Sequence, residues 1–141
     1  MKSDFIYFGL FLNQDIKNKL MNILKSTEYY KILEKADNIY LDHCTLLHCS
    51  QNYPKLKEYL QSKLKCEFSA TITSIGISDK AIAFGVKFSL LRDGRSMCAN
   101  NHPHITIATF NGGKPVDSNN IKEWIEFPMI LIDGTILKVS E

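Results

Sequence analysis

The chain has 141 residues, of which 45% are hydrophobic and 23% charged, and its net charge is +2. This length and composition are those of a single globular domain, spanning residues 1–141, that can bury a core. No apolar run approaches the ~20 residues of a membrane span. The charge is too small for a protein that coats nucleic acid, so a polyanion would have to be recognised locally.

The cysteines form no Cys-x-x-Cys pair and are too sparse for a disulfide-stapled secreted domain. We therefore expect reduced thiols in a cytoplasmic protein. A zinc site built from the cluster around His43 is disfavoured, because His43 and Cys44 would point to opposite faces of a strand. The other members of that cluster are His48 and Cys49.

The opening segment, MKSDFIYFGLFLNQD, briefly resembles a signal peptide, but Asp4 precedes its short apolar stretch and no small-residue cleavage site follows. A buried strand over residues 5–12 is the better interpretation. Asn13 then predicts a helix N-cap, and residues 14–24 carry apolar side chains at helical spacing. The chain is therefore expected to begin with a strand followed by an amphipathic helix.

Three further elements are expected in the first half. Residues 27–37 predict another turn or two of helix, and residues 39–48 have the apolar character of a second strand. Pro54 occupies a first-turn position, which predicts a helix over residues 53–65.

The second half is predicted to consist of strands and loops. Residues 66–78 and 81–91 form an expected antiparallel pair, and residues 104–110 a further strand. Residues 129–140 predict a hairpin with Asp133-Gly134 at its tip. Strands and helices mix without strict βαβ alternation, which indicates an α+β fold with mainly antiparallel sheets.

One four-residue pattern occurs twice, as HCTL and as HITI. The first contains His43 and Thr45, and the second His104 and Thr106. Residues two apart share one face of a strand, so each histidine should project beside its threonine while the intervening residues pack inward. The pattern predicts four polar groups that can surround one small charged centre.

Two imidazoles and two hydroxyls are the set of groups that phosphodiester cleavage needs. One histidine can take a proton from the attacking oxygen while the other gives one to the leaving oxygen. The hydroxyls can donate to the non-bridging phosphoryl oxygens as negative charge develops there. This chemistry needs no metal, and we expect no cofactor. RNA, with a hydroxyl beside every phosphate, is the natural substrate class.

At these motifs the chain resembles the two-histidine (2H) phosphoesterase superfamily, which is marked by paired His-x-[Ser/Thr]-apolar motifs. His43 and His104 match the motif histidines, and Thr45 and Thr106 match the hydroxyl residues. The segments YFGLFL and NHPHITIAT look most like the cyclic phosphodiesterase domains of RNA-repair ligases. They also look like viral and cellular enzymes that cleave 2',5'-oligoadenylates.

The resemblance implies a bilobal α+β fold, with two mainly antiparallel sheets around a central groove that holds both histidines. It leaves three functions open. We expect a 2',5'-oligoadenylate phosphodiesterase that antagonises the antiviral response, because the chain is minimal in length. The alternatives are a 2',3'-cyclic phosphodiesterase of RNA repair and a non-catalytic RNA-binding module. The substrate partner would be a short RNA or 2',5'-oligoadenylate, and we expect a monomer without membrane attachment.

Other residues are weaker candidates for substrate contact. Tyr7 or Phe84 is a candidate to stack on a base, with burial in the core as the alternative. Arg92 is a candidate phosphate contact in a loop, with a solvated charge as the alternative. His48 stands an odd number of residues from the first motif histidine and should face away from it. His102 precedes a proline and should lie in an extended loop.

Overall fold

The structure, a computed structural model, describes residues 5–140, so Asp4 and the rest of the first four residues lie outside the described part. Helices and strands are mixed, as the sequence predicts, but their order differs from the prediction at residues 39–48 and 129–140. The elements are β1 (Tyr7–Leu12), α1 (Gln14–Lys25), α2 (Tyr29–Leu33), β2 (Asn38–Ile39), β3 (His43–His48), α3 (Pro54–Ser62), β4 (Glu67–Ile77), β5 (Ala81–Lys87), β6 (His104–Thr109), the 3-10 helix η1 (Pro115–Asn120) and β7 (Trp124–Val139).

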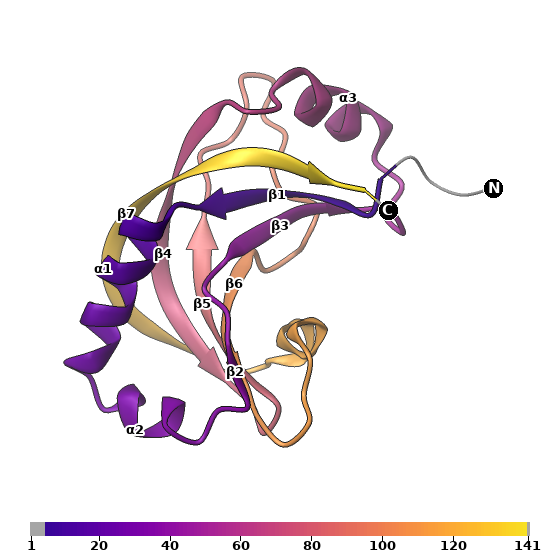
Figure 1. The fold of residues 1–141 in the computed structure, drawn as a ribbon. Coiled ribbons are helices and arrows are strands. Elements are labelled where there is room, and N and C mark those ends of the chain that lie inside the picture. Colours follow the sequence, from indigo (N-terminus) through magenta and orange to yellow (C-terminus); the bar gives the residue numbers. More distant parts are fainter. Residues whose placement is uncertain (1–4, 141) are drawn as a thin grey trace.

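The strands form one antiparallel sheet that closes on itself. Its order is β2-β6-β3-β1-β7-β4-β5, and β5 pairs again with β6 to complete the ring. The antiparallel expectation is confirmed, whereas the two separate sheets of a bilobal fold are not found. The reason is the length of β7, which pairs with β4 over most of its course and with β1 at its end. Figure 1 shows β7 as the long curved band that connects β1 on one side of the sheet to β4 on the other.

The helices cover the sheet from outside and contribute to the core. Helices α1 and α2 lie on the left of Figure 1, and α3 at the top. Asn13 Oδ1 accepts a hydrogen bond from the Ile16 N–H at 2.9 Å, which confirms the predicted N-cap. Leu20 and Leu24 of α1 are fully buried. Truncating either to alanine would cost roughly 2–5 kcal/mol of stability.

The predicted strand over residues 39–48 is interrupted. Leu41 has a φ of +53°, in the left-handed region that is costly for a leucine, and this kink divides the segment into β2 and β3. The Leu41 side chain is buried, at 3% exposure, so core packing holds the unfavourable backbone in place. Past the kink, β3 begins at His43 and carries the first motif.

The predicted hairpin over residues 129–140 is wrong, because these residues belong to the continuous strand β7. Gly134 does not form a turn. A Cβ atom added to it would lie 2.6 Å from Leu10 Cγ and 3.0 Å from the Phe11 carbonyl oxygen. Glycine is therefore needed here because β1 approaches β7 closely. In the sequence, the resulting Asp-Gly pair is indistinguishable from the Asp-Gly of a hairpin turn.

Two smaller observations complete the fold. Within residues 5–140, no helix is both long and apolar enough to cross a membrane. All four cysteines are free thiols, with Cys44 and Cys98 buried and Cys49 and Cys66 exposed.

Candidate active site

Both His-x-Thr motifs open onto one cavity of about 550 Å³. In β3 and in β6 the motif histidine and threonine are half-buried, whereas the residues between and after them are fully buried in the core. The predicted alternation of faces is thus confirmed. The motif side chains that line the cavity are His43, Thr45, His104 and Thr106.

Ring packing holds His43. Its imidazole stacks on Tyr7 at 5.0 Å between ring centroids and on Phe11 at 4.8 Å, with interplanar angles of 19° and 23°. Gly9 of the paired strand β1 makes room for this arrangement, because a Cβ atom there would lie 3.3 Å from His43 Cδ2. No hydrogen bond is made by either ring nitrogen of His43 to any described residue. The His43 ring is therefore oriented by its packing against two neighbouring aromatic rings, and no described residue occupies its nitrogens.

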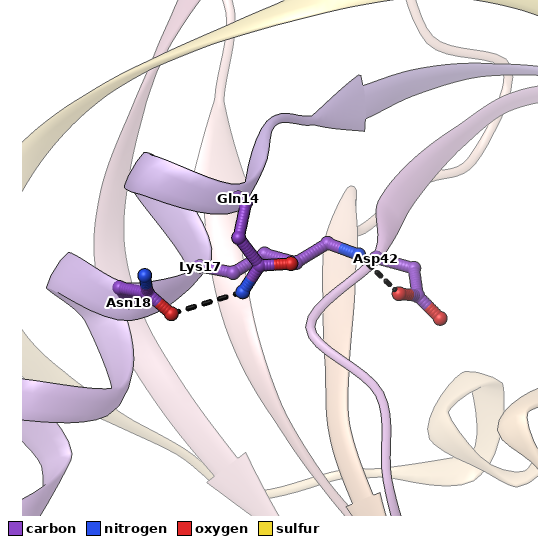
Figure 2. Close-up of polar contacts among 4 residues, drawn as sticks. All are labelled: Gln14, Lys17, Asn18 and Asp42. Carbon is purple, nitrogen blue, oxygen red and sulfur yellow. Dashed lines mark hydrogen bonds and ion pairs between the residues drawn. The ribbon is translucent and has the colours of Figure 1, made fainter.

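Charges beside His43 act on it in opposite directions. Burial lowers the pKa of His43, the Asp42 carboxylate raises it, and positive charge on His104 or Lys17 lowers it. Lys17 reaches from α1 to Asp42, with 2.8 Å between Nζ and Oδ1. Figure 2 shows this pair, with the Gln14–Asn18 hydrogen bond next to it on α1. Because positive charge on His104 disfavours the charged form of His43, the cavity resists holding two protons at once.

His104 is held by a hydrogen bond instead. Its Nδ1 lies 3.0 Å from the His102 carbonyl oxygen. A carbonyl can only accept, so Nδ1 carries the proton and Nε2 of the neutral ring is left with its lone pair. Burial lowers the pKa of His104, and the hydrogen bond to His102 partly offsets that effect. The neutral ring therefore presents an acceptor at Nε2.

The two motif hydroxyls also differ. Thr106 Oγ1 lies 2.9 Å from Ser118 Oγ and 3.4 Å from the Pro115 carbonyl oxygen, and Ser118 is buried. Thr45 Oγ1 has no hydrogen-bond partner in the part of the chain that the structure describes. Its backbone carbonyl instead accepts a hydrogen bond from Asn100 Nδ2 at 3.4 Å, which ties the segment that precedes β6 to β3.

His48 lines the same cavity, contrary to the prediction that it faces away. A β-bulge explains the difference. Phe8 pairs with Leu47 while Gly9 pairs with Thr45, so β3 carries one extra residue and its alternation reverses. The two adjacent buried leucines were the sequence signal for this bulge. The Ser50 N–H donates to His48 Nδ1 at 3.1 Å, so the neutral ring carries its proton on Nε2.

The structure separates the weaker candidates. Tyr7 lines the cavity beside His43. Phe84 is fully buried against Phe127, with 5.4 Å between ring centroids, so it cannot stack on a base. Arg92 lies in a different cavity with Tyr59 and is not brought to the histidines. The core and loop alternatives therefore hold for Phe84 and Arg92.

Sequence reasoning missed several loop residues that line the cavity. They belong to no motif, and only the folded chain brings them to the histidines. The missed residues are Tyr40, Asp42, Ser50, Gln51, Asn100 and Asn119.

Within the described part of the chain, no lysine or arginine lines this cavity. A phosphate bound there would therefore meet imidazole rings and neutral donors. Residues 5–140 contain no group of three or more His, Cys, Asp or Glu that could hold a metal ion.

Comparisons with known proteins place this chain in a family. The family model described as the fungal tRNA ligase phosphodiesterase domain matches residues 1–128. A solved structure titled "Crystal Structure of Fungal RNA Kinase" is similar in fold, with a TM-score of 0.57 and 18% identity. The match covers 99% of this chain but 45% of that one, so this chain spans less than half the length of that protein. No curated protein matches.

These findings favour the RNA-repair alternative over the expected 2',5'-oligoadenylate specificity, for which they give no support. The family match covers most of the chain, both motifs included. The chain therefore belongs to the family of fungal tRNA ligase phosphodiesterase domains, and it is a phosphodiesterase of the two-histidine type.

Proposed function

We propose that this domain opens 2',3'-cyclic phosphates at the ends of RNA, as one catalytic unit spanning residues 1–141. The observation that carries the proposal is the convergence of two histidines and two threonines, from separate parts of the chain, on one cavity. The membership in a family of tRNA ligase phosphodiesterase domains supports the cyclic substrate. The substrate and the catalytic roles of the residues are part of the proposal.

His104 is the general base. Its Nε2 lone pair takes a proton from water as the water oxygen bonds to phosphorus. The hydrogen bond from Nδ1 to the His102 carbonyl keeps the ring in this tautomer and stabilises the imidazolium that forms.

His43 is the general acid. Burial lowers the pKa of both rings, so both are neutral at pH 7 in the empty cavity. The negative charge of a bound cyclic phosphate favours one proton in the cavity, and Asp42 directs it to His43. As the bond from phosphorus to one ribose oxygen breaks, His43 protonates that oxygen. The other ribose oxygen keeps the phosphate, and the product is a phosphomonoester.

Neutral donors stabilise the charge that develops on the non-bridging oxygens. The Thr45 hydroxyl makes no hydrogen bond to any described residue. Thr106 donates to the Pro115 carbonyl oxygen over a long 3.4 Å contact, so when Ser118 donates to Thr106, the Thr106 hydrogen can leave that contact and turn toward the phosphate. The Nε2–H of His48 provides a third donor on the same face.

The test is a comparison of three substrates in the presence of a chelator: 2',3'-cyclic AMP, 2',5'-linked triadenylate and 3',5'-linked triadenylate. We expect only the cyclic nucleotide to be opened, with loss of turnover in His104→Ala. Arg92→Ala is the matched control, because this side chain lies in a different cavity. Cleavage of the 2',5'-linked triadenylate alone would overturn the proposed substrate and restore the sequence-based expectation.

A further inference from the structure

A second cavity adjoins the one that holds the motif histidines. It has a volume of about 370 Å³, which is enough for a nucleoside. The two cavities share His104, Gln51, Asn100 and Asn119 as lining residues. A ligand that fills the first cavity and continues past His104 therefore enters the second. The proposed reaction takes place at the terminal phosphate and by itself gives this second space no occupant.

An aromatic pair forms part of its wall. The rings of His102 and Trp124 stack with 3.9 Å between centroids and 20° between planes. Both rings lie over glycines, since a Cβ atom on Gly76 would be 2.6 Å from Trp124 Cε3, and one on Gly85 would be 3.1 Å from His102 Nε2. Gly76 and Gly85 belong to the paired strands β4 and β5. The backbone is thus built to seat this pair.

The exposed side of the pair is suited to a nucleobase. His102 is an exposed residue that lines this cavity although its ring stacks on Trp124, so part of the His102 side chain is accessible to a ligand. The amide side chains of Asn101 and Asn119 line the same cavity and make no hydrogen bond to any described residue. They are available for the edge of a base. No lysine or arginine is among the described residues that line this cavity. Stacking and neutral hydrogen bonds are therefore what it offers a ligand.

We propose that this second cavity binds the nucleotide that precedes the cyclic-phosphate end, with its base stacked on the His102 ring. The inference rests on the proposed function and adds to it a second binding site, which makes an RNA end of two nucleotides a better substrate than a 2',3'-cyclic mononucleotide. The terminal nucleoside occupies the first cavity beside Tyr7, and its 5' neighbour lies beyond His104.

The kinetic test compares 2',3'-cyclic AMP with diadenylate that ends in a 2',3'-cyclic phosphate. Stacking of one base on an aromatic ring predicts a kcat/KM about tenfold higher for the dinucleotide. His102→Ala should bring this ratio close to one, and His102→Phe should restore it, because phenylalanine keeps a ring at the position. The His102 carbonyl that orients His104 belongs to the backbone, so it is present in both variants. In Arg92→Ala the ratio should equal that of the wild type.

A binding test is independent of turnover. Trp124 is the one tryptophan of the chain, so its fluorescence reports on this cavity directly. At equal concentrations, diadenylate 3'-phosphate should quench the Trp124 fluorescence several-fold more than 3'-AMP does. In His102→Ala the two ligands should quench equally.

The outcomes separate the two proposals. Efficient opening of the cyclic mononucleotide with a dinucleotide ratio near one, and equal quenching by both ligands, would overturn the second subsite and leave the proposed function standing. Preferential quenching by the dinucleotide in a protein that opens neither cyclic substrate would support the subsite and overturn the reaction.

Discussion

The two His-x-Thr motifs carry the same residue types but are supported differently. Stacked rings hold the first histidine, His43, and neither its ring nitrogens nor the Thr45 hydroxyl make a hydrogen bond within residues 5–140. A hydrogen bond to a backbone carbonyl holds His104, and Thr106 is bonded to a buried serine hydroxyl. A sequence repeat therefore does not make the two halves chemically equal. The surroundings assign an acceptor to the second motif, while Asp42 favours a proton on the first.

The largest expected effect comes from removing each imidazole. His43→Ala and His104→Ala should each lower kcat for 2',3'-cyclic AMP by on the order of 10²–10⁴-fold, the usual contribution of acid–base catalysis. A 4-nitrophenolate leaving group departs without being protonated. A substrate that carries it therefore distinguishes the general acid from the general base. On bis(4-nitrophenyl) phosphate, His43→Ala should retain more of the wild-type rate than His104→Ala does. Equal losses on both substrates would contradict the assigned difference. Circular dichroism verifies that both variants are folded.

The threonines come next. Thr45→Ala and Thr106→Ala should each lose on the order of 10²-fold in kcat, as for the removal of one charge-stabilising donor. Their stabilities should differ, because Thr106→Ala leaves the buried Ser118 hydroxyl without that partner, at a cost of about 1–3 kcal/mol. Thr45→Ala should stay within about 0.5 kcal/mol of the wild type. Urea unfolding measures both, with Thr45→Ser and Thr106→Ser as controls. Similar losses of stability would show that the two hydroxyls are equivalent.

A smaller effect concerns the pH dependence of kcat/KM. Asp42 raises the pKa of His43 and Lys17 lowers it, whereas neither acts on His104. Asp42→Asn should therefore move the alkaline limb of the profile, which reports the general acid, to lower pH. Lys17→Met should move it to higher pH. The acidic limb, which reports the base, should stay in place in both variants. A shift of both limbs together would contradict the assignment of the acid to His43.

The smallest effect is on folding. The pKa values of His43 and His104 are lowered by burial in the native state, so the unfolded chain binds more protons as pH falls. Above about pH 6.5 the two histidines should not reduce the free energy of unfolding. As the pH falls from that value to the lowered native pKa values, the free energy of unfolding should decrease. Urea titrations at pH 7.5 and pH 5.5 test this. The double variant His43→Gln, His104→Gln should show a smaller decrease than the wild type.

The sequence was sufficient for the local features that follow from periodicity. The cap at Asn13, the start of α3 at Pro54 and the alternation of faces in both motifs depend on neighbouring residues alone, and all three are found. The α+β fold class followed from the predicted order of helices and strands along the chain.

The errors concern features that depend on distant contacts. Asp133-Gly134 resembles a turn, but its glycine is required by the side chain of Leu10 on another strand. The bulge that redirects His48 depends on the register of β3 against β1. Trp124 and the asparagines around the second cavity belong to no motif, because loops from separate parts of the chain assemble that wall only in three dimensions. No local pattern could have placed them.

The closure of the ring has a further consequence. Strand β3 meets β6 through one bridged pair, Cys44 and Ile105, both fully buried. Each of these residues directly follows a motif histidine in the chain. The relative position of the two histidines that line the cavity therefore depends on the packing of two buried apolar side chains on the opposite side of the strands. Substitutions of Cys44 or Ile105 could change the spacing of the motif histidines and leave the polar lining of the cavity unchanged.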